Sequence, residues 1–192
     1  MSGGMTIMLK NVMHETEEKM KKSIEILRKD LMTMRAGRAN PSILDKLTVD
    51  YYGAITPLNQ IANISAPEPR LITIQPWDKT IIPAVEKSIL KSDLGLNPSS
   101  DGAIIRIIIP QLTQERRMEL VKTLKKKGED TRVSLRNIRR DSNEKLKSME
   151  KSKEITEDEN KKSQDEVQKL TDKYIKEVDH VLEVKENEIM EV

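Results

Sequence analysis

Three long stretches of this chain repeat apolar side chains at intervals of three and four residues, and this spacing constrains the fold more than any other feature. The repeating positions include Leu9, Met20 and Leu31, then Leu124, Leu135 and Leu146, then Val167, Tyr174 and Val181. Residues three and four apart share one face of an α-helix, so each stretch predicts a long helix with a single apolar seam. Because the other faces are charged, the seams can be buried only against one another. The pattern therefore predicts an antiparallel three-helix bundle.

Residues at two of the predicted helix ends have the chemistry of helix termini. Gly37 accepts the left-handed conformation that ends many helices, and Pro41 disfavours helical geometry at Asn40. The first helix is therefore predicted to end at Gly37. Thr156 and Glu159 have the spacing of a capping box, which predicts the start of the third helix.

The segment between the first and second helices has a different pattern. Short runs rich in β-branched residues predict strands at 47–53, 70–76 and 103–110. A helix is predicted at 81–92, with a proline tolerated in its first turn. Residues 93–102 are rich in turn-forming residues and are predicted to be a connection.

These patterns together predict an α+β protein of two domains. The three-helix bundle comprises residues 1–37 and 111–192, and a small β/α/β domain of residues 38–110 is inserted between its first two helices. Two short chain crossings join such a domain to the bundle, and paired crossings can act as a hinge. The predicted hinge residues are Gly37, Arg38, Ala39, Asn40, Pro110, Gln111 and Leu112.

Charge is distributed unevenly along a chain whose formal net charge is only +2. Residues 113–153 hold fourteen Lys and Arg against seven Asp and Glu, whereas residues 154–192 hold six against thirteen. A strongly basic surface can therefore exist on a nearly neutral protein, where it would attract a polyanion.

The basic segment concentrates four arginines on one side of the second predicted helix. An α-helix turns by about 100° per residue, and Leu135 marks the centre of the seam. Measured from it, Arg132, Arg136, Arg139 and Arg140 fall between about 40° and 140°. We call these four residues the arginine strip.

Two interpretations of the arginine strip stay open from the residues alone. The arginines can pair with carboxylates on the acidic third helix, as solvated helix faces commonly do. Alternatively, they bind the backbone phosphates of folded RNA or of a duplex, because a planar guanidinium recognises phosphate through two hydrogen bonds. Surface ion pairs contribute little to stability, which favours the phosphate interpretation. The chain has no Phe, and its single Trp lies elsewhere, so stacking on single-stranded bases is not expected.

The sequence offers little for catalysis. It has no cysteine, and His14 and His180 are isolated on helical segments. It has neither a glycine-rich phosphate-binding loop nor the spacing of a calcium loop. We therefore expect no enzymatic activity, no cofactor and no metal. No apolar run is long enough for a membrane span, and we expect a cytoplasmic monomer. A coiled-coil chaperone or another coiled-coil nucleic-acid-binding protein is the alternative on these grounds.

Several long segments resemble the bacterial ribosome recycling factor family. They are MRAGRANPSILD (34–45), VDYYGAITPLNQIANI (49–64), PAVEKSILKSDLGLNPSSDG (83–102), PQLTQERR (110–117), RVSLRNIRRDSNEKLK (132–147) and SQDEVQKLTDKYI (163–175). The similarity extends in register from Met8 to the end of the chain.

The resemblance implies a two-domain, L-shaped protein that is similar to tRNA in outline. It implies binding to the 70S ribosome after termination, mainly to large-subunit rRNA at the A and P sites. The small domain would be engaged by elongation factor G, whose GTP hydrolysis helps to separate the subunits. Positions that contact rRNA or are needed for activity in this family correspond to Arg35, Arg38, Arg136, Arg139 and Arg140. Together with the rest of the arginine strip, they are the expected rRNA-binding residues.

Overall fold

The computed structural model describes residues 6–34 and 37–191 and divides the chain into two compact units. The first unit comprises Met1–Met34 and Glu115–Val192, and the second comprises Arg35–Gln114. The sequence placed the inserted domain at 38–110, so the compact unit extends three residues further at one end and four at the other.

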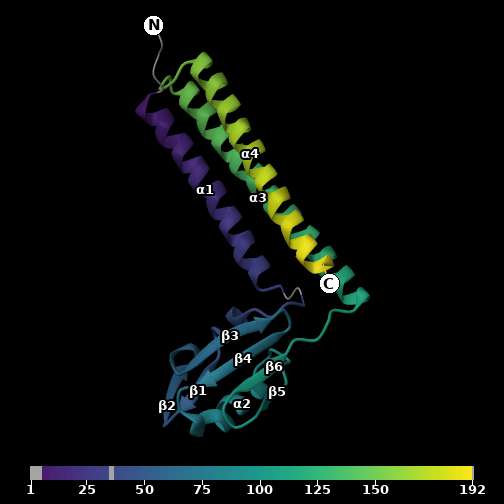
Figure 1. The fold of residues 1–192 in the computed structure, drawn as a ribbon. Coiled ribbons are helices and arrows are strands. Elements are labelled where there is room, and N and C mark those ends of the chain that lie inside the picture. Colours follow the sequence, from purple (N-terminus) through teal and green to yellow (C-terminus); the bar gives the residue numbers. More distant parts are fainter. Residues whose placement is uncertain (1–5, 35–36, 192) are drawn as a thin grey trace. The chain divides into compact units, whose positions relative to one another are not determined.

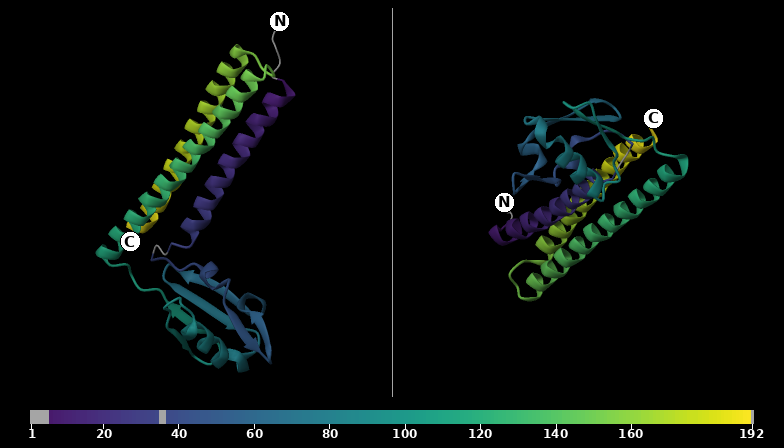
Figure 2. Two further views of the ribbon diagram at one scale, coloured as in Figure 1. Left: turned by 180° about the vertical axis from the view of Figure 1, so that it is seen from behind. Right: turned by 90° about the horizontal axis from the view of Figure 1, so that it is seen from below.

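Three long helices, which lie side by side in Figures 1 and 2, form the first unit. They are α1 (Ile7–Met32), α3 (Gln114–Lys151) and α4 (Glu157–Met190). Lys145 of α3 pairs with Glu15 near the start of α1. Lys127, earlier in α3, pairs with Asp30 near the end of α1, so these two helices run antiparallel.

Helix α4 runs parallel to α1 and antiparallel to α3. The Tyr174 hydroxyl donates a hydrogen bond of 2.8 Å to Glu17 of α1. Further along both helices, Arg28 pairs with Glu177 at 3.0 Å. The bundle therefore has an up-down-up order, in which only α3 and α4 are joined by a short connection.

The seams that the apolar spacing predicted form the core of the bundle. Leu124, Leu135 and Leu146 of α3 are fully enclosed, as are Met20 of α1 and Val167 of α4. The predicted three-helix bundle with an inserted β/α domain is confirmed.

A polar pair interrupts this apolar core. The buried hydroxyls of Thr16 and Ser142 lie 2.6 Å apart. Since the Thr16 hydroxyl donates to the carbonyl of Val12 at 2.7 Å, it accepts the hydrogen bond from Ser142. Any other register of α1 against α3 would separate the two buried hydroxyls and lose the hydrogen bond between them, which opposes slippage of the helices.

The helix ends agree only in part with the sequence predictions. Helix α4 begins with the predicted capping box, in which Thr156 and Glu159 each accept a hydrogen bond from the other's backbone N–H. The prediction that α1 ends at Gly37 is wrong, because the helix ends at Met32. The backbone N–H of Thr33 bonds to the carbonyls of Asp30 and Leu31 and closes its last turn.

The second unit consists of a four-stranded antiparallel sheet, a two-stranded hairpin and one α-helix, as Figure 1 shows. The hairpin strands are β1 (Thr48–Tyr51) and β2 (Ala54–Pro57). The sheet has the order β3-β4-β6-β5. Its strands and the helix are β3 (Ala62–Glu68), β4 (Leu71–Pro76), α2 (Ile82–Lys91), β5 (Pro98–Ser100) and β6 (Ile105–Ile108).

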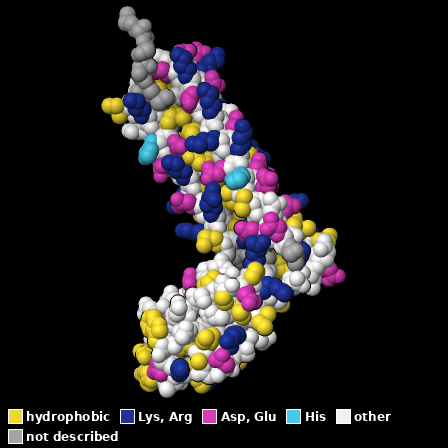
Figure 3. Space-filling view, in the orientation of Figure 1, with side chains coloured by type: hydrophobic (Ala, Val, Ile, Leu, Met, Phe, Trp, Pro, Cys, Tyr) yellow, Lys and Arg dark blue, Asp and Glu magenta, His cyan; other side chains and the backbone are white. Residues whose placement is uncertain are grey.

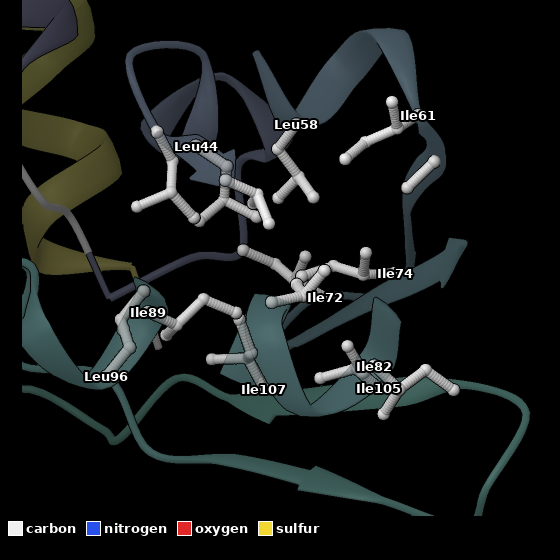
Figure 4. Close-up of a cluster of buried hydrophobic side chains, with 14 of the residues drawn as sticks. Leu44, Leu58, Ile61, Ile72, Ile74, Ile82, Ile89, Leu96, Ile105 and Ile107 are labelled. Atoms are coloured by element: carbon white, nitrogen blue, oxygen red, sulfur yellow. The ribbon is translucent and has the colours of Figure 1, made fainter. Parts of the chain in front are cut away.

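An aliphatic core lies between one face of this sheet and α2 together with the hairpin. Figure 4 shows Ile72 and Ile74 of β4 and Ile105 and Ile107 of β6 pointing into it beside Ile89 of α2. The alternate residues of β4 and β6 face outward, so the sheet leaves its other face without a covering helix.

The sequence missed three of the six strands, for physical reasons. Strands β3 and β5 are the two edges of the sheet, and edge strands tolerate Pro and polar residues that central strands do not. A β-bulge between Ser65 and Glu68 accommodates Pro67 in β3. Residues 47–53, predicted as one strand, contain β1 and a tight turn in which Tyr52 and Gly53 have φ values of 51° and 86°. Strand β2 follows this turn.

Candidate nucleic-acid interface

Helix α3 carries cations along one face over most of its length. Its predominance of Lys, Arg, Glu and Leu favours a long helix. The cations at about 40° to 140° from Leu135 are Lys122, Lys125, Arg132, Arg136, Arg139, Arg140 and Lys147. We call this set the basic face, and at 1.5 Å per residue it extends for about 37 Å.

The first two lysines of the basic face were not predicted from the sequence. Lys125 lies seven residues before Arg132, and Lys122 lies fourteen before Arg136, so both share the heptad positions of the strip. That spacing was the available signal. Both lysines are exposed, as is Lys147 at the other end.

The arginine strip divides into two pairs with different surroundings. Arg132 is held most firmly, and only 24% of its side chain is exposed. Its Nε donates to Oδ1 of Asp179 on α4 at 3.1 Å, and Nη2 donates to the same oxygen. Its remaining nitrogen, Nη1, donates to Glu129 at 3.4 Å. The hydrogen bond with Asp179 raises the pKa of Arg132, so this guanidinium stays charged.

Arg136 shares the Glu129 carboxylate with Arg132. Its Nη1 donates to Oε1 of Glu129 at 3.0 Å, two helical turns away. This hydrogen bond is the main reason that the pKa of Glu129 lies below its usual range. The first half of the strip is therefore neutralised by two carboxylates. Asp179 lies on the third bundle helix, where the ion-pair interpretation placed the partners, whereas Glu129 lies on α3 itself.

Arg139 and Arg140 form the second half, and neither pairs with a carboxylate among the described residues. Nη1 of Arg139 donates to the neutral amide oxygen of Gln168 on α4 at 3.3 Å. Arg140 is exposed and makes no hydrogen bond or ion pair with any described residue. These two guanidiniums therefore carry the positive charge of the strip that is available to an external anion.

The basic residues of α1 do not extend this surface. Lys21 and Arg28 lie seven residues apart on α1 and would widen the basic surface if they lay beside the strip. Arg28 instead pairs with Glu177 of α4, whereas Arg132 pairs with Asp179. Glu177 and Asp179 are two residues apart on α4, so their side chains point in directions about 200° apart around the helix axis. Helix α4 therefore lies between Arg28 and Arg132. Figure 3 shows the resulting alternation of basic and acidic side chains along the bundle.

Arg35 lies outside the described residues. Arg38 is exposed and belongs to the second compact unit. The predicted hinge residues from Gly37 onward also belong to that unit, where the N–H of Ala39 bonds to the carbonyl of Pro69 at 2.6 Å. The other crossing lies beside the first, because a Cβ atom built on Gly37 would lie 3.1 Å from Cγ of Leu112. Their role as a hinge stays a prediction.

Other kinds of site find no support in residues 6–34 and 37–191. No group of three or more His, Cys, Asp or Glu is placed to hold a metal ion there. None of the described helices combines the length and apolar character that crossing a membrane requires. A pocket of about 250 Å³ lies between α1 and α3, lined by Ser23, Asp30, Lys127 and Ser134 among others. These α3 residues are on the side of the helix opposite the basic face.

The fold and this surface together define a class of protein: a three-helix bundle with an inserted α/β unit and an arginine-rich face suited to a polyanion. Residues 27–190 match the sequence pattern of the family described as "Ribosome recycling factor". The ribosome-recycling factor of Heliobacterium modesticaldum is 65% identical over 96% of this chain and 100% of that relative. The factor of Syntrophomonas wolfei is 64% identical over the same shares.

Solved structures agree with the sequence matches. A solution structure of a ribosome recycling factor superposes with a TM-score of 0.76 and is 42% identical, covering 98% of this chain and 100% of that chain. The T. thermophilus ribosome recycling factor, bound with E. coli elongation factor G to the E. coli post-termination complex, has a TM-score of 0.61. It is 48% identical and covers 95% of this chain and 98% of that chain. This chain belongs to the ribosome recycling factor family, which consists of non-enzymatic translation factors.

Proposed function

We propose that this chain recycles ribosomes: with elongation factor G and GTP, it splits post-termination ribosomes into subunits and releases them from mRNA. The main support for this proposal is the 65% identity to a ribosome-recycling factor along the whole length of that relative. A relative of 48% identity is seen with elongation factor G on a post-termination complex. The function belongs to the cytoplasm, where ribosomes work. Nothing in the described residues favours the alternative of a chaperone or a non-ribosomal nucleic-acid binder.

In this proposal the basic face of α3 binds the phosphates of large-subunit rRNA at the A and P sites. Arg139 and Arg140 make the first contacts, because no carboxylate neutralises them among the described residues. A guanidinium binds phosphate through charge-assisted hydrogen bonds, each of which contributes about 1.5–3 kcal/mol. Arg35, Arg38, Arg132 and Arg136 are the further rRNA-binding residues of the proposal.

Elongation factor G acts on the inserted unit in this proposal. The two chain crossings, at Gly37–Asn40 and Pro110–Leu112, form the hinge. The bundle is suited to transmit force, because long helices with a closely packed core and a fixed register resist bending and sliding. The chain itself catalyses no reaction, and GTP hydrolysis by elongation factor G supplies the free energy.

The test is a splitting assay with purified post-termination ribosomes, this protein, elongation factor G and GTP, in which each component is omitted in turn. Subunit separation should require all of them. The variant Arg139→Ala/Arg140→Ala should bind ribosomes about tenfold or more weakly, which corresponds to about 1.4 kcal/mol. The negative slope of the logarithm of the binding constant against the logarithm of the salt concentration should become less steep by about 2, one for each lost phosphate contact.

A matched control is Lys22→Ala/Lys29→Ala, which removes two exposed cations from α1. It should bind like the unmodified protein, since its charges lie outside the basic face. Equal splitting without this protein would refute the proposed function. Equal loss of binding in both double variants would refute the role of the arginines while leaving the function intact.

A further inference from the structure

We propose that Glu129 and Asp179 determine the specificity of the basic face by occupying Arg132 and Arg136 until a matching array of phosphates displaces them. The two carboxylates would act as internal competitors of phosphate. They would weaken binding to irregular RNA more than binding to the ribosomal surface. This inference rests on the proposed function, and it assigns a role to acidic residues within an otherwise basic surface.

The two carboxylates bind guanidinium groups that a phosphate would otherwise bind. Both oxygens of Glu129 are engaged, Oε1 by Arg136 and Oε2 by Arg132. Asp179 accepts two hydrogen bonds from Arg132 through a single oxygen. Three of the five N–H groups of the Arg132 guanidinium therefore bond to carboxylates, and a phosphate can bind those three only by replacing a carboxylate.

These ion pairs contribute little to the fold. The side chains of Glu129 and Asp179 are 54% and 55% exposed. Pairs exposed to this degree stabilise proteins by less than about 1 kcal/mol. Their larger effect is on the charge of the surface, because two carboxylates cancel half of the four guanidinium charges of the arginine strip.

This cancellation discriminates between RNA targets. Non-specific RNA binding gains free energy from released counterions, in proportion to the number of phosphates neutralised. A flexible RNA that reaches the strip finds only Arg139 and Arg140 unneutralised by carboxylates. A rigid RNA surface that contacts those two and the lysines of the basic face holds further phosphates beside Arg132 and Arg136. There the exchange of carboxylate for phosphate becomes favourable.

The test uses the full chain with the substitutions Glu129→Gln and Asp179→Asn, separately and together. Gln and Asn keep the shape and an acceptor oxygen but remove the negative charge. Binding to poly(U) RNA and binding to ribosomes are each measured across a series of salt concentrations. Glu119→Gln is the matched control: it also removes one charge from a paired glutamate of α3, 2.9 Å from Arg116, but at about 200° from Leu135.

The double variant should bind poly(U) about tenfold or more tightly at about 50 mM salt, with a salt slope steeper by about 1.4. Its preference for ribosomes over poly(U) should fall by a similar factor, whereas Glu119→Gln should change neither quantity by more than about twofold. Poly(U) affinity no higher than that of Glu119→Gln would overturn the inference, as would an unchanged preference for ribosomes. Failure of the unmodified protein to bind ribosomes would instead refute the proposed function, a result that the poly(U) measurement does not depend on.

Discussion

Gly128 lies in the middle of α3 and packs directly against Leu182 of α4. A Cβ atom at position 128 would clash with Cδ1 of Leu182 and would lie 3.0 Å from Cδ2 and 3.1 Å from Cγ. Because Cγ and both methyl groups surround the same point, rotation of the terminal methyl groups alone cannot make room. The substitution Gly128→Ala therefore forces either a new rotamer of Leu182 or a separation of the two helices.

Two opposing contributions determine how much Gly128→Ala changes the stability of the protein. Adding a methyl group to a packed core costs about 1–3 kcal/mol. Replacing Gly by Ala inside a helix gains about 1 kcal/mol, because Ala has the higher helix propensity. We expect Gly128→Ala to destabilise the protein by about 1 kcal/mol, which for a chain of this size lowers the melting temperature by about 2–4 °C.

The assay is urea unfolding followed by far-ultraviolet circular dichroism, for the unmodified chain, Gly128→Ala, Leu182→Ala and the double variant. Leu182→Ala removes the clashing atoms. In that background Gly128→Ala should become stabilising by about 1 kcal/mol, because only its helix propensity remains. The diagnostic result is that Gly128→Ala destabilises the unmodified protein but stabilises the Leu182→Ala variant. The same stabilisation by Gly128→Ala in both backgrounds would refute the claim that Leu182 restricts position 128.

Two further predictions concern the stability of the bundle. Tyr174→Phe removes the hydroxyl that holds the pKa of Glu17 below its usual range, and should cost about 1–2 kcal/mol at neutral pH. Since a lowered pKa in the folded state stabilises above the unfolded value, the difference between the two proteins should shrink as the pH falls below about 4.5, as urea titrations at several pH values would reveal. Thr156→Ala breaks the capping box of α4 and should cost about 1 kcal/mol in the same assay, whereas Thr156→Ser should retain most of the stability.

The bundle could be predicted from the sequence because its seams obey one repeating rule. Leu124, Leu135 and Leu146 recur at helical spacing, and each is fully buried. The edge strands could not be predicted in this way, since residues such as Pro67 and Ser99 are acceptable there only because one side of the strand has no partner. That property belongs to the assembled sheet and leaves no periodic signal.

The arginine strip was predictable as a set of positions but not as a set of environments. Helical geometry alone places Arg132 and Arg140 on the same side of α3. Asp179 and Gln168 become neighbours of the strip only once α4 has docked in its particular register, more than 25 residues further along the chain. The distinction between neutralised and available arginines therefore depends on tertiary structure.

The short distance between Gly37 and Leu112 has a consequence for how the bundle assembles. A Cβ built on Gly37 would lie 3.1 Å from Cγ of Leu112, so the folded insertion begins and ends at nearly the same point. An unstructured loop of roughly 80 residues would cost about 3 kcal/mol more to close than a loop of about four residues. Once the insertion has folded, this entropic cost has already been met within it. The entropic cost of bringing α1 and α3 together is then that of a short loop, although a whole α/β unit connects them.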